Sequence, residues 1–106
     1  MGVKYTIIIP HYNSADSLEK LLLSIPRIPD FQVIVIDDSS TVDEDKLVQV
    51  IADDGRCEFY RNTTGVQSAG ACRNIGLTHA LGKWLLFADA DNFFVDGFKL
   101  FGGLLQ

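Results

Sequence analysis

Positive charge is scarce in this sequence, and that scarcity excludes one large class of partner. The 106 residues carry 9 Lys and Arg against 14 Asp and Glu, giving a net charge of −5, and the basic residues form no cluster. A protein that binds nucleic acid needs such a cluster to neutralise successive phosphates. We therefore expect no nucleic-acid partner, and a small anionic ligand would need a local positive group or a metal ion.

Cysteine and long apolar runs are also scarce. Cys57 and Cys72 are the two cysteines, too few and too far apart for a disulfide framework or a zinc knuckle. The opening "MGVKYTIIIPHYN" contains an apolar run of strand length only, so we expect neither a signal peptide nor a membrane span to begin there. These features favour two reduced thiols and a cytoplasmic location, or, in a longer parent protein, the inner face of the membrane.

What the sequence does contain is typical of one globular domain with a single core. It is 47% hydrophobic and 22% charged. Four segments rich in β-branched and aromatic residues predict strands. They are "VKYTIII" (3–9), "FQVIVI" (31–36), "RCEFYR" (56–61) and "KWLLFA" (83–88). Pro10 is expected to end the first strand, because proline donates no hydrogen bond to a sheet.

Three segments between these strands have the spacing and the capping residues of helices. They lie at 14–26, 40–55 and 68–82. Ser14 or Asp16 is available to cap the first helix, and Ser40 with Asp43 forms a capping-box-like pair for the second. Residues 95–106 could form a further helix, which three glycines weaken by about 1 kcal/mol each.

Alternating strands and helices with short links predict an α/β fold: a Rossmann-like, open and mostly parallel sheet with helices on both faces. Ligands bind such sheets at the carboxyl ends of the strands, where the strand order reverses. Polar clusters follow three of the four predicted strands. They read "HYN" after the first, "DDSS" after the second and "DAD" after the fourth.

Asp89 and Asp91 stand one residue apart at the end of an apolar segment. In a continuing strand their Cα atoms would be about 6.5 Å apart, and their charges would repel by roughly 2 to 3 kcal/mol at an effective dielectric of 20. A divalent cation reverses the sign of that interaction, and Mg²⁺ and Mn²⁺ prefer carboxylate oxygens. The alternative is that Asp89 caps a helix while Asp91 is solvated in a loop.

The other candidate residues each have a structural alternative. Asp37 or Asp38 could accept hydrogen bonds from a ligand or could cap the following helix. Arg73, with Asn74 beside it, could face a phosphate or pair with an acid. His11 lies at a strand end, where a ligand contact is expected, and His79 fits a helix C-terminus. Tyr12 could stack on a flat ring or close the core.

Taken together, these motifs resemble the inverting nucleotide-sugar glycosyltransferases of family 2, which have the GT-A fold. The resemblance rests on "IIIPHYN", "VIVIDDSS" and "GVQSAGACRNIGLTHALGKWLLFADADN", in that order, and it covers essentially the whole chain. It implies that residues 1–106 are the nucleotide-sugar-binding half of a glycosyltransferase domain, with the acceptor-binding half missing.

The resemblance also implies roles for individual residues. The segment of Pro10, His11 and Tyr12, with Asn13 beside them, would line the nucleotide base pocket, and Asp38, next to Asp37, would recognise uracil or another base. The helix that carries Ala71, Arg73 and Asn74 would border the donor diphosphate. The DxD of Asp89, Ala90 and Asp91 would contact the ribose and hold Mn²⁺ or Mg²⁺ on the diphosphate.

Two departures from the family pattern affect what can be expected. Ser39 stands where the family often has glycine, a mild difference. The catalytic base, an acid that deprotonates the acceptor hydroxyl, is expected downstream of Gln106, so these residues should bind a UDP-linked donor without turnover. The loss of the second half should also expose apolar surface near "FFVDGFKLFGGLL", and we expect self-association.

Two other functions remain open at this stage. One is Mg²⁺-dependent phosphoryl transfer on an aspartate, although enzymes of that kind place the reacting acid after the first strand, where this chain reads "PHYN". The other is a binding module without metal chemistry. A classical dinucleotide-binding domain is disfavoured because no G-x-G-x-x-G follows the first strand.

Overall fold

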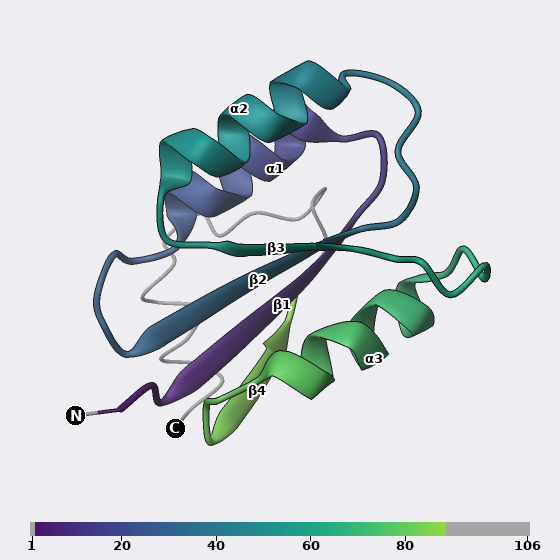
Figure 1. The fold of residues 1–106 in the computed structure, drawn as a ribbon. Helices are drawn as coiled ribbons and strands as arrows, with labels where there is room; N and C mark the ends of the chain where they lie inside the picture. Colours follow the sequence, from purple (N-terminus) through teal and green to yellow (C-terminus); the bar gives the residue numbers. More distant parts are fainter. Residues whose placement is uncertain (1, 89–106) are drawn as a thin grey trace.

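The computed structural model describes residues 2–88 of the chain (Figure 1). Strands and helices alternate, as the sequence predicts. They are β1 (Tyr5–His11), α1 (Ala15–Ser24), β2 (Phe31–Asp37), α2 (Glu44–Asp54), β3 (Glu58–Arg61), α3 (Ala69–His79) and β4 (Trp84–Phe87). The helix predicted at 95–106 lies outside the described residues.

The four strands form one parallel sheet in the order β3-β2-β1-β4. Helices α1 and α2 cover one face and α3 covers the other (Figure 1). The predicted fold class is therefore confirmed. The chain moves from β1 to β2 to β3 in one direction and then returns to place β4 on the other side of β1. The strand order thus reverses between β1 and β4, which is where ligands bind in open α/β sheets.

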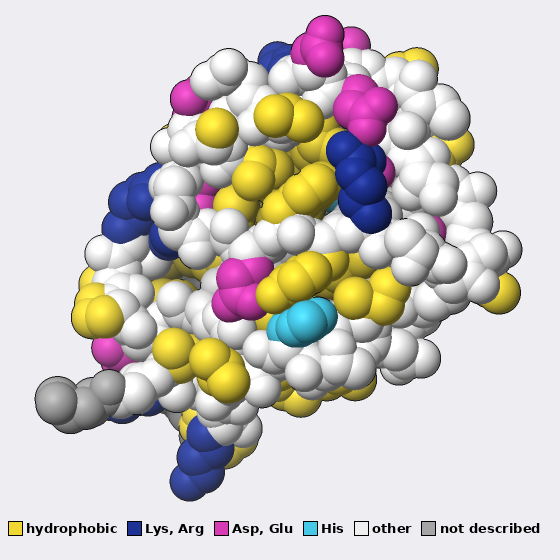
Figure 2. All heavy atoms as spheres, viewed as in Figure 1, with side chains coloured by type: hydrophobic (Ala, Val, Ile, Leu, Met, Phe, Trp, Pro, Cys, Tyr) yellow, Lys and Arg dark blue, Asp and Glu magenta, His cyan; other side chains and the backbone are white. Residues whose placement is uncertain are grey.

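The core consists of two apolar layers, one on each face of the sheet. Ile7 and Ile9 of β1 pack with α1 and α2, whereas Ile8 packs with Cys72 of α3. Successive strand residues point to opposite faces, so burial of both faces requires an unbroken apolar run. On the face shown in Figure 2, apolar side chains also gather along β3, the edge strand between α2 and α3.

Pro10 does not end β1, contrary to the sequence prediction, because its nitrogen lies on the side where no partner is needed. The Ile8 carbonyl accepts from Ala88 of the β4 side, and the His11 carbonyl accepts from Asp38 of the β2 side. The backbone groups of successive strand residues point alternately to the two neighbouring strands, so the Pro10 nitrogen, like the Ile8 carbonyl, points toward β4. The pairing of β4 with β1 ends at Ile8, so no strand partner faces that nitrogen. The strand therefore continues to His11 through its pairing with β2.

The residues at the helix ends agree only in part with the predicted caps. Gly55 ends α2 with φ of 75°, and Ser68 caps α3 by accepting a hydrogen bond from the Ala71 backbone N–H at 3.0 Å. The capping box predicted for α2 is wrong. Asp43 precedes α2 without a side-chain cap hydrogen bond, and the Ser40 hydroxyl donates to Asp37 instead.

Small residues allow α3 to approach the sheet. A Cβ on Gly76 would stand 2.5 Å from Cγ2 of Ile8, which is fully buried. A Cβ on Gly82 would stand 2.7 Å from the backbone nitrogen of Thr6. These glycines therefore fix the distance of α3, and of the turn that follows it, from β1. No helix between residues 2 and 88 has the length and apolar character needed to cross a membrane.

Candidate functional site

The carboxyl ends of three strands bring polar side chains to one edge of the sheet. In the parallel register His11 of β1 is paired with Asp37 of β2, and Asp37 is paired with Arg61 of β3. The sequence predicted the first two of these residues at this edge. It did not predict Arg61, although "RN", at the end of the third strand, is a polar cluster like those at the ends of the others.

Asp37 is the centre of this edge and is completely buried. Its Oδ1 accepts from the Ser40 hydroxyl at 2.5 Å and from His11 Nδ1 at 3.0 Å. Its Oδ2 accepts from Arg61 Nη1 at 3.0 Å and from the Ser40 backbone N–H at 3.1 Å. Burial alone would raise the pKa of this carboxyl, but the hydrogen bonds from Ser40 and His11 together hold that pKa below its ordinary value. The protein thus occupies both oxygens, so Asp37 is placed to support the site.

The hydrogen bonds of His11 determine which of its ring nitrogens carries the proton. The Ser14 backbone N–H donates to Nε2 at 3.0 Å, so Nε2 must present its lone pair. The proton therefore lies on Nδ1 and is donated to Asp37. The ring is 2% exposed and connects β2 to the first turn of α1. His11 consequently holds the loop that carries Tyr12 and Asn13.

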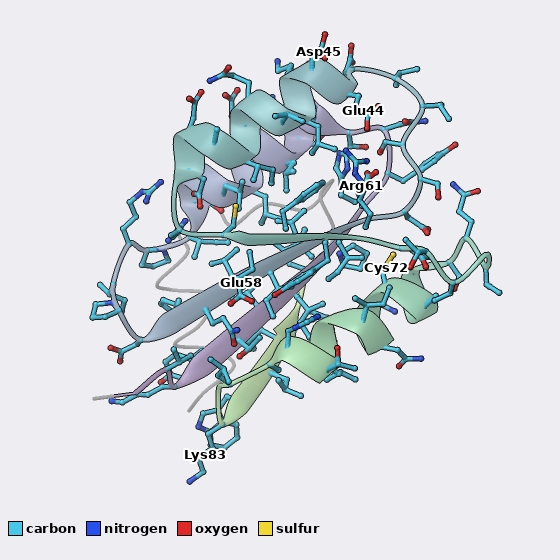
Figure 3. All side chains as sticks on the ribbon, viewed as in Figure 1. Glu44, Asp45, Glu58, Arg61, Cys72 and Lys83 are labelled. Carbon is cyan, nitrogen blue, oxygen red and sulfur yellow. The ribbon has the colours of Figure 1, made fainter. Side chains whose placement is uncertain are left out.

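Arg61 links this edge to the start of α2. Its Nη2 lies 2.7 Å from Oε1 of Glu44, while its Nη1 binds Asp37. In Figure 3 the Arg61 side chain rises from β3 toward Glu44. The guanidinium also lies over the Phe59 ring, 5.2 Å from its centroid. Arg61 therefore holds the loop between β2 and α2 against the sheet.

Asp38 lies beside this network, and its surroundings are different. One carboxylate oxygen, Oδ1, accepts from Asn62 Nδ2 at 2.8 Å, and its backbone carbonyl accepts from Gln67 at 2.9 Å. The side chain of Cys72, on α3, is close: burial, the charge of Asp38 and a hydrogen bond to Asp38 raise the pKa of this thiol to about 12. Burial likewise raises the pKa of Cys57 to about 12, and both cysteines are free, as predicted.

Tyr12 and Asn13 follow β1 and have different roles. Tyr12 is 47% exposed, so it does not close the core and its ring is available to a ligand. Asn13 has φ of 50°, and its side-chain oxygen accepts from the backbone N–H groups of Thr41 and Val42 at 2.8 and 3.2 Å. Asn13 thus joins the loop after β1 to the loop after β2, which fixes the position of Tyr12.

The predicted residues of α3 lie on two sides of that helix. The guanidinium of Arg73 lies over the Phe87 ring of β4, 5.6 Å from its centroid, on the side where the strand order reverses. Asn74 is exposed and lines an open surface hollow of about 600 Å³ between α3 and the loop that precedes it. Ala71 lines the same hollow. The structure therefore brings Arg73, more than Asn74, toward the carboxyl end of β4.

The predicted metal-binding residues are not among those the structure describes. β4 ends at Phe87, and Asp89, Ala90 and Asp91 lie outside the described residues. Between residues 2 and 88 there is no group of three or more His, Cys, Asp or Glu side chains that could hold a metal ion. β4 runs parallel to β1, toward the carboxyl edge that His11 and Asp38 line.

Comparison with known proteins connects this geometry to a family. The sequence matches Glycosyl transferase family 2 over residues 6–100. A glucosyltransferase of Campylobacter jejuni, "GalNAc(5)-diNAcBac-PP-undecaprenol beta-1,3-glucosyltransferase", is 33% identical over 89% of this chain and 31% of its own. The Staphylococcus aureus "Poly(ribitol-phosphate) beta-N-acetylglucosaminyltransferase TarS" is 32% identical over 86% of this chain and 17% of its own.

Solved structures of glycosyltransferases share the fold. Residues 1–349 of S. aureus TarS in complex with UDP-GlcNAc align with 97% of this chain at a TM-score of 0.77 and 27% identity. The mannosyltransferase PcManGT of Pyrobaculum calidifontis, in complex with GDP-Man and Mn²⁺, aligns with 94% at a TM-score of 0.76 and 29% identity. The chain spans 30% and 31% of these two structures, and 15% of an uncharacterised glycosyltransferase of Rickettsia felis.

Proposed function

The chain belongs to glycosyl transferase family 2, and from that premise we propose that the protein transfers a sugar from a nucleoside diphosphate donor, UDP-linked, to an acceptor hydroxyl with inversion. Its described residues form the part of the site that binds the donor. The observation that carries the proposal is the carboxyl edge of the sheet, where the exposed Tyr12 follows β1 and Asp38 follows the neighbouring β2, its backbone N–H bound to the His11 carbonyl.

The base of the donor is the part that these residues recognise. Tyr12 offers a flat aromatic face for stacking, and the loop that carries it is held by His11 and Asn13. Asp38 offers a hydrogen-bond acceptor to a base with a ring N–H, such as uracil. Asp37 supports the loop that carries Tyr12, through its hydrogen bonds with His11 and with Ser40, whose hydroxyl accepts from the Asn13 backbone N–H. The UDP-GlcNAc complex of the similar TarS structure supports this choice of donor.

The diphosphate is assigned to the other side of the edge. Arg73, at the β4 side, supplies a planar cation that suits phosphate oxygens. We propose that Asp91, with Asp89, holds Mn²⁺ or Mg²⁺, and the Mn²⁺ complex of the similar PcManGT structure supports this. When bound, such an ion offsets the charge that builds on the leaving diphosphate. These residues bind and orient the donor, and the base that deprotonates the acceptor is not among them.

Isothermal titration with UDP, with and without Mn²⁺, tests the proposal. We expect the wild-type chain to bind UDP more tightly with Mn²⁺ present. Asp91→Ala should remove the Mn²⁺-dependent part of the affinity and leave the metal-free part. Asp53→Ala is the matched control, because Asp53 lies on the exposed side of α2 and its substitution should change neither. A folded wild-type chain that binds no UDP would refute the proposal.

A further inference from the structure

Asn62 is the first residue after β3, and its side chain belongs to a hydrogen-bond network that ends on Asp38. The residue is 8% exposed. Its Nδ2 donates to Asp38 Oδ1 and to the Val66 carbonyl, both at 2.8 Å. Its Oδ1 accepts from the backbone N–H and the hydroxyl of Thr64, at 3.0 and 2.7 Å. Both N–H groups and the oxygen of the amide are therefore in use.

The partners of this amide allow it only one orientation. An exchange of Oδ1 and Nδ2 would set an acceptor against the carboxylate of Asp38 and the carbonyl of Val66. It would also set a donor against the N–H of Thr64. Each of these contacts would lose its hydrogen bond, so Asn62 presents an N–H to Asp38.

Asp38 is restrained on three sides by the elements around it. Its backbone N–H donates to the His11 carbonyl at 2.8 Å, and its own carbonyl accepts from Gln67 Nε2 at 2.9 Å. The Asn62 amide binds Oδ1 of the carboxylate. The first two contacts fix the backbone, whereas Asn62 alone among these three fixes the side chain. The direction of the second carboxylate oxygen, Oδ2, therefore depends on Asn62, together with the Cys72 thiol that hydrogen-bonds to this carboxylate.

We infer that Asn62 is a positioning residue for base recognition, whose amide fixes the Asp38 carboxylate as an acceptor for the ring N–H of the donor's base. The inference rests on the proposed function, in which Asp38 contacts the base. Asn62 acts through Asp38 and needs no contact with the nucleotide.

The chemistry of the pyrimidine bases makes this role measurable. Uracil has a donor N–H at the ring position where cytosine has an acceptor nitrogen. A fixed carboxylate pairs with the first and leaves two acceptors facing each other with the second, which is a costly arrangement. A carboxylate that is free to turn must be ordered to bind uracil and can turn away from cytosine. Loss of Asn62 should therefore lower the affinity for UDP more than that for CDP.

The test is titration of the full chain with UDP and with CDP, in the wild type and in Asn62→Leu. Leucine is close to asparagine in size and removes the donors. We expect the variant to lose about tenfold in UDP affinity with little change for CDP, so that the preference for UDP falls by about tenfold. Thr64→Val is the control, because it alters the same loop and leaves the Asn62–Asp38 hydrogen bond in place; its preference for UDP should match that of the wild type.

The outcomes separate this inference from the proposed function. Equal losses for UDP and CDP, or no change in either, would overturn the role of Asn62, while a loss of preference in Asp38→Asn would still support the proposed function. A wild type that binds neither nucleotide would overturn both. If Asn62→Leu does not fold, Asn62→Ala carries the same test: its preference for UDP over CDP should fall by about tenfold. An unchanged preference would count against the inference.

Discussion

Two adjacent carboxylates, Asp37 and Asp38, differ in how fully the protein binds their oxygens. Asp37 ends β2 with both oxygens bound by the protein, and Asp38 follows with one oxygen bound by Asn62. The sequence predicted both as ligand contacts, because the local sequence does not distinguish the roles of two adjacent acids at the end of a strand. What distinguishes them is strand pairing, which places Asp37 between His11 of β1 and Arg61 of β3. A local sequence pattern cannot predict this pairing.

Asp37→Asn should lower the free energy of unfolding by about 2–4 kcal/mol, because it leaves Arg61 and Ser40 facing a partly mismatched amide in a buried site. The pKa of Asp37 is lowered from 3.8 in the folded state. The ionised Asp37 carboxylate therefore contributes fully to the free energy of unfolding above about pH 4. This contribution is lost as the pH falls through the pKa that Asp37 has in the folded state. Urea unfolding of both proteins from about pH 6 to pH 2.5 measures this. A wild type and variant whose difference in stability stays constant over that range would refute it.

Ser39 adopts φ of 66°, the left-handed conformation that glycine takes without strain. This explains in physical terms why a glycine is common at this position in the family the sequence resembles. Ser39→Gly should raise the free energy of unfolding by about 0.5–1 kcal/mol, measured by denaturant unfolding. Asn13→Gly is the control: it relieves a similar φ of 50° but removes the hydrogen bonds to Thr41 and Val42, so it should destabilise by about 1 kcal/mol. Stabilisation by both substitutions, or by neither, would contradict this explanation.

At the scale of elements, the close contact of α3 with β1 sets where Arg73 and Cys72 stand relative to the edge. Gly76→Ala should destabilise the protein by about 1–3 kcal/mol, because the new methyl group meets the buried Ile8 side chain. Gly70→Ala on the same helix meets only Ser68 Oγ at 3.9 Å and should stabilise by about 0.5–1 kcal/mol through helix propensity. Thermal unfolding of the two variants gives the comparison, and equal effects would show that the packing argument is wrong.

The sequence predicted the existence and order of the described elements because each has a strong local signal. Apolar runs such as "FQVIVI" and breakers such as Gly55 and Pro26 act within a few residues. One error arose where a contact distant in sequence decided the outcome: Pro10 stays within β1 because of where β4 ends, which requires knowledge of the strand order. The other error is local. The Ser40 hydroxyl donates to Asp37, three residues earlier in the chain, and does not cap α2.

At the scale of the molecule, the sequence predicted the location of the site, at the carboxyl edge of the sheet. It did not predict the hydrogen bonds that connect the residues there. Strand-end polar clusters identified His11, Tyr12 and Asp38 correctly as neighbours. Arg61 and Asn62 were missed because β3 is short and their partners lie 24 residues away in the chain. Asp89 and Asp91 lie outside the described residues, and their metal-binding role stays a prediction.

The exposed apolar side chains of β4 support the predicted self-association. Trp84, Leu85 and Phe87 are 53%, 41% and 50% exposed on a strand that pairs with β1 alone among the described strands. Apolar side chains on such an edge favour pairing with another chain. We expect sedimentation velocity to show dimers or larger species that increase with concentration, and Trp84→Lys to reduce them. A chain that stays monomeric at all concentrations would contradict the prediction.

The central claim is that the carboxyl edge of the sheet, between β1 and β4, binds the nucleotide of the donor. The most direct measurement is the change in backbone amide chemical shifts on titration of the ¹⁵N-labelled chain with UDP and Mg²⁺. The account predicts that the largest shifts occur at Tyr12, Asp38 and Arg73. It predicts no comparable change at Thr6 and Gln32, at the opposite end of the same strands. Shifts concentrated at that opposite end, or on the outer surface of α1 and α2, would contradict it.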